Sequence, residues 1–408
     1  MKPLLTNPSL TNDQSGTLKA GRHSIHTGPD IWLGVTVAAL LSMGIVMTYS
    51  AVVPGYMAVL EIDFGILIKH MMHIAIGLAL LLAAVSVRIS HLQLAGRTLL
   101  FIGFLALLVL LYSDLGVEVN GGRRWIEISG FRFQPSEFMK LAAVIYFADY
   151  LSRKKDDLHL FKVSIINVGA VLGIIGLLLF ESDFGTTALI IITVLTMMLL
   201  AGVRFWHISV VVLVASGLLA LMIAMKPHRI ERIKIYLDLD NAEPLGSGYQ
   251  LWQSLIAIGR GEWFGMGIGN SIQKISYLPH AGNDFLIAII GEELGAVGIF
   301  SVLTLYILLL IRAFSISRKA FYLGERFSGF LAQGIGVLLT FQAIIHICVN
   351  VGLLPTKGLT LPMMSTGGSS MLCSLAAIGL LFAVDRQNRT HPRVTPSGSY
   401  VYREAIRR

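Results

Sequence analysis

Ten long apolar segments constrain this chain more than any other feature. A helix of about 20 residues crosses a hydrocarbon layer of ~30 Å, and each segment approaches that length. The sequence is also 55% hydrophobic and only 14% charged. It therefore predicts an all-α polytopic membrane protein with about ten transmembrane helices. We place the segments at residues 31–52, 64–86, 97–113, 136–152, 164–180, 184–201, 206–225, 284–311, 327–352 and 364–385.

Basic residues are distributed unevenly between the predicted loops. The net charge of +8 does not indicate a nucleic-acid partner, because Lys and Arg occupy short loops and the two tails. Cytoplasmic loops of membrane proteins carry an excess of these residues. We therefore predict two cytoplasmic termini, with a polar tail at 1–29, a transmembrane domain at 30–386 and a basic tail at 387–408. The basic residues of the short outer loops are Arg123, Arg124, Arg132 and Lys357.

One predicted outer loop, 226–283, is too polar to span and longer than an ordinary connection. It precedes the eighth apolar segment. Residues 249–258 have the pattern of an amphipathic helix on the membrane surface, with Trp252 at headgroup level. The glycine-rich run G-R-G-E-W-F-G-M-G-I-G-N follows. It lacks the Lys-Ser/Thr of a P-loop and the βαβ setting of a dinucleotide site. It predicts either a close backbone approach or a flexible connector.

Asp284 stands where this polar loop becomes the eighth apolar segment. A carboxylate at such a boundary is partly wet and partly desolvated, which suits a general base. Asn283 and Asp284 are equally suited to capping the first turn of the helix, because their side chains accept bonds from free N–H groups. The residues alone leave both interpretations open.

The loop before the fourth segment carries Arg123 and Arg124, followed by Trp125 at the predicted interface. Arginine binds phosphate through two parallel hydrogen bonds, so an outward-facing pair suggests an anionic ligand. The alternative is a salt-bridged loop that uses Glu118 and Glu127.

Ionisable groups also lie inside the predicted spans. Lys140 follows Glu137 by one helical turn, so the two can pair, and a lysine there should face the protein interior. Glu292 and Glu293 are functional candidates, unless one of them pairs with a basic group on a neighbouring span. Gln342, His346 and Asn350 share one helical face and could hydrogen-bond between helices. Before the last span, Gly367 and Gly368 allow tight turning ahead of Ser369 and Ser370.

Taken together, these motifs resemble the SEDS family (shape, elongation, division and sporulation), and most closely its division-type branch. The resemblance covers nearly the whole membrane region in family order. One departure lies just before Asp284, where L-P-H-A-G-N replaces the common L-P-E-A-H-T and His280 stands in place of the glutamate. The matching stretches are N-G-G-R-R-W-I-E-I from Asn120, F-Q-P-S-E from Phe133, E-S-D-F-G-T from Glu181, G-S-G-Y-Q from Gly246, the glycine-rich run from Gly259, D-F-L-I-A-I-I-G-E-E-L-G from Asp284, and K-G-L-T-L-P-M-M-S-T-G-G-S-S from Lys357.

The resemblance implies a peptidoglycan glycosyltransferase of the bacterial cytoplasmic (inner) membrane that polymerises lipid II at the division septum. It implies a class B penicillin-binding protein, an FtsI-like transpeptidase, and other divisome proteins as partners. The family's essential aspartate falls on Asp284. The candidate substrate-binding residues are Arg123, Arg124, Trp125, Lys140, Lys274, Ser369 and Ser370. The candidate polar network is Glu137, Glu292, Glu293, Gly367 and Gly368.

Lipid II carries its sugars on an undecaprenyl diphosphate. A divalent cation, Mg²⁺ or Mn²⁺, is a further candidate for neutralising that diphosphate. Two alternatives remain beside this hypothesis. One is a lipid II flippase, which would need polar groups through the bilayer and access from both sides. The other is the elongation-type polymerase of the same family.

Overall fold

The computed structural model is mostly helical. The helices are α1 Ile31–Val52, α2 Phe64–Ser86, α3 Ile89–Tyr112, α4 Pro135–Lys154, α6 Phe184–Leu200, α7 Phe205–Ala224, α9 Tyr249–Gly261, α10 Leu286–Tyr322, α11 Arg326–Asn350 and α12 Gly368–Thr390. The structure describes residues 28–52, 64–113, 116–119, 122–128, 131–154, 173–174, 176, 178, 183–224, 248–275, 278, 282–356, 358–390, 393–394 and 400–401.

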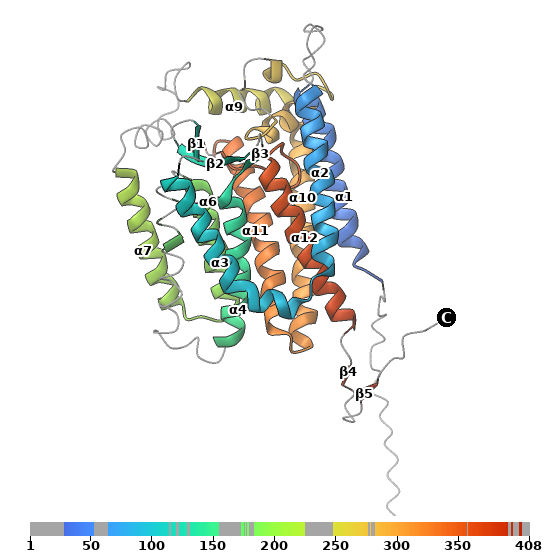
Figure 1. The fold of residues 1–408 in the computed structure, drawn as a ribbon. Helices are drawn as coiled ribbons and strands as arrows, with labels where there is room; N and C mark the ends of the chain where they lie inside the picture. Colours follow the sequence, from blue (N-terminus) through green and yellow to red (C-terminus); the bar gives the residue numbers. More distant parts are fainter. Residues whose placement is uncertain are drawn as a thin grey trace, which may run out of the picture.

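Every predicted apolar segment except 164–180 coincides with a described helix, and 164–180 lies largely outside the described residues. Within the described ranges, six helices are long and apolar enough to cross a membrane: α1, α2, α3, α10, α11 and α12. Helices α6 and α7 are shorter apolar helices. Helix α4 carries five charged residues, which lower its hydropathy although it lies within the bundle (Figure 1). The polar tail and most of the basic tail lie outside the described residues.

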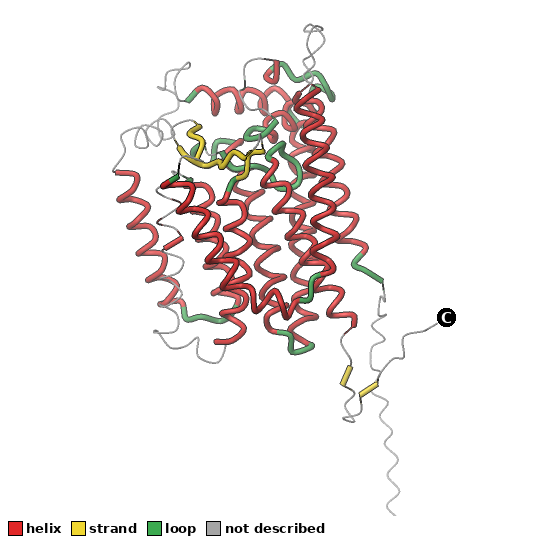
Figure 2. The backbone as a smooth tube through the Cα atoms, in the orientation of Figure 1, coloured by secondary structure: helices red, strands yellow, loops and turns green. Residues whose placement is uncertain are grey.

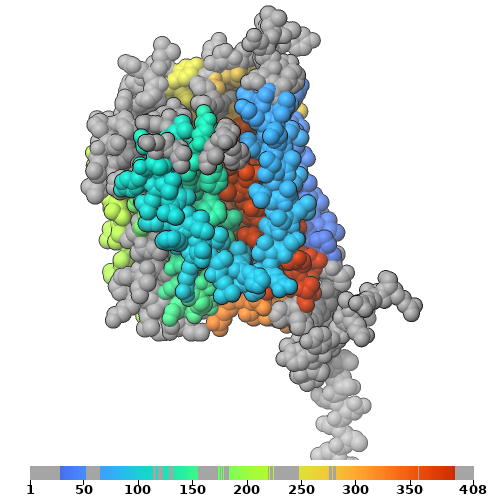
Figure 3. Space-filling view, viewed as in Figure 1, coloured from blue at the N-terminus to red at the C-terminus, as the bar shows by residue number. Residues whose placement is uncertain are grey.

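Helix α11 lies at the centre of the bundle and contacts α4, α6, α10 and α12. Small residues allow this close packing. A Cβ at Gly334 would meet Val144 of α4 at 2.6 Å, and a Cβ at Gly336 would meet Ala313 of α10 at the same distance. Helix α12 reaches the surface between α2 and α3 (Figure 3). Exposed leucine, isoleucine and phenylalanine side chains on α2, α3 and α7 then fit a lipid environment.

A three-stranded antiparallel sheet covers one end of the bundle beneath α9 (Figures 1 and 2), which we call the sheet end. Its strands are β1 Gly116–Val119, β2 Gly122–Ile128 and β3 Phe131–Phe133. This sheet corrects the expectation of an all-α protein. The segment is short, and its β-branched and aromatic residues alternate with charged ones between glycine-containing turns, which favours hairpins over a helix. A second pair of short strands, β4 Arg393–Val394 and β5 Tyr400–Val401, follows α12.

Helix α10 is longer than its predicted apolar segment and is broken near its first third. Hydropathy ends the segment at residue 311, because Arg312 is charged, but the helical backbone continues to Tyr322. Gly295 has a φ of 70° and interrupts the regular helix. Only glycine adopts this conformation without strain. The break lies beside the segment that follows α9, and it organises the site described below.

Charged residues tie three helices together at the end opposite the sheet. Arg312 of α10 pairs with Asp30, just before α1. The Asp30 N–H donates to Asp385 Oδ2 of α12 at 3.2 Å. Arg389 donates to the same Asp385 oxygen at 3.1 Å. This network anchors α1 and α12, the first and last described helices of the bundle, against α10.

Candidate active site

Asp284 lies in a turn at the sheet end, directly before α10, and is half-buried. The N-cap residue of α10 is Phe285, whose side chain makes no capping bond. The N–H of Ala288 instead donates to Oδ1 of Asn350 on α11 at 3.1 Å. Asn350 also donates from Nδ2 to the carbonyl oxygen of Asp284 at 3.2 Å. A side chain from α11 therefore caps the helix, and Asp284 is not its N-cap.

The turn that carries Asp284 is held from a second side by the segment before α12. Ser365 Oγ donates to the Asn283 carbonyl oxygen at 2.8 Å. The Thr366 N–H donates to the Gly282 carbonyl oxygen at 3.2 Å. Asn283 Nδ2 donates to Asp284 Oδ1 at 2.9 Å, which orients the carboxylate. The position of the carboxylate is thus set by contacts to two other parts of the bundle.

Arg124 of β2 faces the same space as Asp284. A Cβ built at Gly358 would lie 3.2 Å from Asp284 Oδ2 and 4.0 Å from Arg124 Nη1. Both charged groups therefore approach the backbone of Gly358, where glycine leaves room for them. Successive side chains of a strand point to opposite faces. Arg123 accordingly is exposed and lies along β1, with its Cδ 3.6 Å from a Cβ built at Gly116.

The rest of the sheet agrees in part with the salt-bridge alternative. Arg132 of β3 donates to Glu127 of β2 at 2.9 Å, and both side chains are solvent-accessible. Trp125 is half-buried on β2. The structure therefore separates the two predicted arginines: Arg124 approaches Asp284, whereas Arg123 lies on the other face. Lys357, another predicted outer basic residue, lies outside the described residues, as does His280.

The glycine–glycine and serine–serine pairs pack tightly beside the turn. A Cβ at Gly367 would lie 3.3 Å from Asn283 Oδ1, and a Cβ at Gly368 would lie 2.6 Å from the His73 ring of α2. Ser369 Oγ accepts from the Gln134 N–H at 3.0 Å. Ser370 Oγ accepts from the Thr360 hydroxyl at 2.7 Å. Both serines are buried, so their contacts support the fold around the site.

Lys140 is buried below the site between α4 and α11. Its ammonium donates to Glu137 and to Gln342 Oε1, each at 2.8 Å. This confirms the predicted pair and the inward orientation. Gln342 Nε2 continues the chain to the Thr360 carbonyl oxygen at 2.9 Å. Because all three side chains lie inside the bundle, their observed contacts hold the segment before α12 in place.

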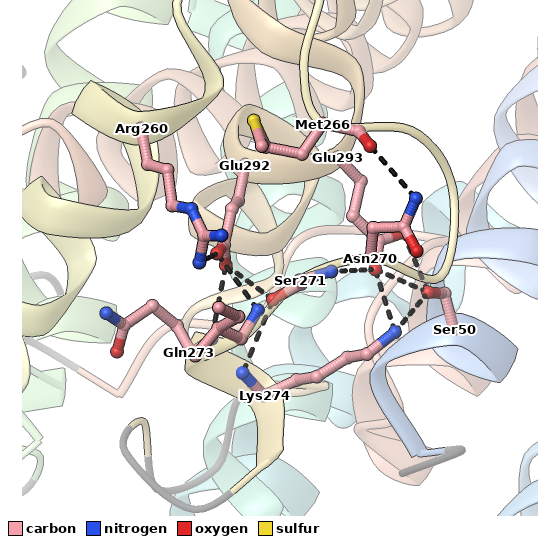
Figure 4. A network of polar contacts seen from close by, with 10 residues as sticks. Ser50, Arg260, Met266, Asn270, Ser271, Gln273, Lys274, Glu292 and Glu293 are labelled. Carbon is pink, nitrogen blue, oxygen red and sulfur yellow. Dashed lines mark hydrogen bonds and ion pairs between the residues drawn. The ribbon is translucent and has the colours of Figure 1, made fainter. Parts of the chain in front are cut away.

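Glu292 and Glu293 of α10 are fully buried and receive several donors (Figure 4). Glu293 accepts from Lys274 Nζ at 2.9 Å and from Ser50 Oγ of α1 at 2.7 Å. Glu292 accepts from the Ser271 hydroxyl at 2.5 Å, from the Ile272 N–H at 3.0 Å and from Arg260 at 3.4 Å. The basic partners belong to α9 and the 3₁₀ helix Gln273–Ile275, not to neighbouring spans.

This network closes the loop that carries Asp284. Lys274 precedes Asp284 in the chain and Glu293 follows it, so their ion pair joins the two sides of the loop. The Lys274 side chain is only 2% exposed, and its ammonium also donates to Ser50 at 3.0 Å. This placement favours a positioning role over the predicted contact with substrate.

The described residues around Asp284 do not form a protein donor set for a metal ion. No group of three or more His, Cys, Asp or Glu side chains within the described ranges could hold one. The buried carboxylates of Glu137, Glu292 and Glu293 are each engaged by a cation of the protein. A divalent cation stays a prediction.

Comparison with known proteins places this arrangement in a class of multi-helix membrane proteins. Residues 31–390 match the model of the FtsW/RodA/SpoVE family, described as "Cell cycle protein". The chain is 42% identical to a probable peptidoglycan glycosyltransferase FtsW of Nitrosomonas europaea, over 89% of this chain and 94% of the relative. It is 46% identical to a protein of the same name in Methylococcus capsulatus, over 78% and 80% of the two chains.

Solved structures agree with the family match. A chain solved to show structural coordination of polymerization and crosslinking by a peptidoglycan synthase complex superposes with a TM-score of 0.72. It is 26% identical, and the match covers 88% of this chain and 98% of that chain. The rod shape determining protein RodA of Thermus thermophilus superposes with a TM-score of 0.63 at 25% identity and the same coverage. The chain belongs to the FtsW/RodA/SpoVE family, which is the SEDS family.

Proposed function

We propose that this protein is a peptidoglycan glycosyltransferase that polymerises lipid II into glycan strands at the division septum of the bacterial inner membrane. Family membership and the similarity to relatives named FtsW support this function. The observation that carries the mechanism is the approach of Asp284 and Arg124 to one point at the sheet end of the bundle. A carboxylate and a guanidinium side by side suit a reaction that removes a proton and releases a diphosphate.

In this mechanism Asp284 is the general base. Its carboxylate takes the proton of the 4-hydroxyl of the acceptor sugar while that oxygen attacks the anomeric carbon of the donor. The bond from this carbon to the diphosphate oxygen breaks, and the lipid diphosphate leaves with the electron pair. A positioned base contributes roughly 10²–10⁴ in rate. Asn283, which donates to Asp284 Oδ1, and Asn350, which holds its carbonyl oxygen, orient the base.

Direct displacement with inversion fits the pairing of the three buried glutamates. A retaining mechanism needs a second carboxylate about 5 Å from the first as nucleophile. The buried Glu137, Glu292 and Glu293 are each paired with a lysine or arginine, which argues against that role. Asp284 then acts without a covalent sugar intermediate.

Arg124 is the group that we assign to the leaving diphosphate. A guanidinium offers parallel N–H donors that match phosphate oxygens and stay charged throughout the reaction. Charge stabilisation of this kind acts most strongly where negative charge develops. Arg123 lies on the opposite face of β2 and is not needed for this contact.

We further propose that the protein works with a class B penicillin-binding protein and other divisome proteins, with both of its own termini in the cytoplasm. The similarity to a chain of a peptidoglycan synthase complex supports a crosslinking partner. The charge distribution of the loops supports the orientation.

Polymerisation of labelled lipid II tests the proposal. The native chain with its partner, whose transpeptidase is blocked, should form polymer, and Asp284→Asn should form none. Glu127→Gln is the matched control, because it removes an exposed carboxylate at the same end of the bundle. Equal polymer from the native chain and Asp284→Asn would remove Asp284 from this role. No polymer from either, with translocation of lipid II in vesicles, would favour a flippase.

A further inference from the structure

Large apolar side chains are exposed on the segment that follows α9. Trp263 is 65% exposed, Phe264 83%, Met266 45% and Ile268 60%. We call these four residues the interfacial cluster. Single exposed apolar residues are ordinary, but a contiguous group of this kind marks an interaction surface.

The backbone of this segment is paired with α10 at the break in that helix. The N–H groups of Met266 and Gly267 donate to the carbonyl oxygens of Glu292 and Glu293 at 2.9 and 3.0 Å. In return, the Ala296 and Val297 N–H groups donate to the carbonyl oxygens of residues 262 and 263 at 2.9 and 3.2 Å. The segment therefore supplies the partners that a regular helix would have supplied. Irregular backbone at membrane depth requires such pairing.

Close packing at the break explains several glycines of this segment. A Cβ at Gly265 would lie 2.2 Å from the Glu293 carbonyl oxygen, and a Cβ at Gly261 would lie 1.8 Å from the Gly291 carbonyl oxygen. Neither position has room for a side chain. This confirms the predicted close backbone approach over the flexible connector. The apolar side chains of the cluster remain exposed.

The positions of the charged residues along α10 indicate where the break lies relative to a bilayer. No charged residue occurs from Leu294 to Ile311, between Glu293 and Arg312. A helix of that length rises about 27 Å, close to the ~30 Å of a hydrocarbon core. Gly295 therefore lies at the edge of this apolar layer on the sheet side. The cluster, which is hydrogen-bonded beside it, lies at the same level.

We propose that the interfacial cluster is seated in the lipid of the leaflet at the sheet end, between the headgroups and the upper acyl chains. Tryptophan and phenylalanine are favoured at this depth. The cluster is continuous with exposed apolar residues of α10 itself, Val297 at 47% and Phe300 at 57%. On α9, which directly precedes the cluster, exposed Trp252 and Ile256 lie on one helical face. Lipid contact then fixes the height of residues 262–274 against the bilayer.

A nitroxide label measures this placement directly in the full-length protein. Phe264→Cys is labelled in a Cys348→Ala/Cys373→Ala background and reconstituted in vesicles of phosphatidylethanolamine and phosphatidylglycerol. Phe300→Cys is the lipid-facing control, and Thr390→Cys, exposed at the polar end of α12, is the aqueous control. A water-soluble nickel complex should relax the nitroxide at residue 264 much less than the nitroxide at residue 390. The nitroxide at residue 264 should keep its relaxation by oxygen, as at residue 300.

A label at 264 that is as accessible to nickel as the label at 390 would overturn the proposal. Shielding that develops only after the partner protein is added would also overturn it, in favour of an apolar segment of that partner. Trp263→Phe provides a second measurement with a mild substitution. Bromine-labelled lipids should quench part of the native tryptophan fluorescence, and Trp263→Phe should reduce that part while other exposed tryptophans, Trp252 among them, keep the remainder. An unchanged quenched fraction would contradict lipid contact at Trp263.

Discussion

Removal of the Lys274 ammonium should weaken the fold and, separately, misplace Asp284. Lys274 Nζ lies 2.9 Å from Glu293 and 3.0 Å from Ser50, and the two charged side chains are 2% and 0% exposed. Lys274→Met leaves a carboxylate buried without its cation, which costs ~3–5 kcal/mol. Because Ser50 still donates to Glu293, we expect a value near the lower end of that range. Thermal unfolding of the purified protein measures this loss.

The same substitution opens the loop that carries Asp284. A misplacement of about 1 Å in a reacting group can lower the rate roughly 10²-fold. Lys274→Met should therefore reduce polymerisation of labelled lipid II by about this factor. Lys274→Met/Glu293→Gln should recover most of the lost stability, since it leaves no uncompensated charge. Its polymerisation should stay low, because the tie between the two sides of the loop is still absent.

Two outcomes would refute this reasoning. If the double variant regains polymerisation together with its melting temperature, the ion pair serves the fold alone. If Lys274→Met melts like the native protein, the buried pair is not formed as described. Arg132→Met is the control for stability, because its exposed pair with Glu127 should contribute no more than about 1 kcal/mol.

Three further substitutions test other parts of the site. Arg124→Ala should lower the initial rate of polymerisation strongly, whereas Arg123→Ala should stay near the native rate. Equal losses in the two variants would show that the face of β2 on which an arginine lies does not decide whether it contacts the diphosphate. Gly261→Ala should destabilise the protein by about 3 kcal/mol or more, because a Cβ there would lie 1.8 Å from a carbonyl oxygen of α10; unchanged thermal unfolding would contradict this packing. Asn350→Ala should cost ~1–2 kcal/mol by removing the cap of the Ala288 N–H. Thermal unfolding that stays unchanged in Asn350→Ala would argue against the capping role.

The spans were predictable because hydropathy alone sets them. Helices α1 and α2 begin and end at the predicted residues, since each is an uninterrupted apolar run between polar segments. The extent of α10 was not predictable in the same way. Its backbone continues past Arg312, where hydropathy falls but hydrogen bonding along the helix does not. The break at Gly295 depends on a partner segment that is remote from it before folding.

Asp284 was predictable as a candidate because it stands at a loop-to-span boundary, and the resemblance placed the family's aspartate there. Its neighbours were harder to predict. Arg124 and Arg123 are equivalent in the sequence, and only the strand geometry of β2 separates them. Gly358 and Ser50 gave no chemical signal, because a glycine and a span serine are ordinary residues until a carboxylate is found beside them.

Glu292 and Glu293 show why the remaining contacts needed the fold. A carboxylate buried in a span was expected to find a cation on a neighbouring span, which is the usual solution inside a bilayer. Here Gly295 breaks α10 just after the two glutamates, and the segment after α9 pairs with the open backbone. Arg260 of α9 and Lys274 of the 3₁₀ helix thereby reach both carboxylates. The break thus joins the segment after α9 to α10 and fixes the turn that carries Asp284 between them.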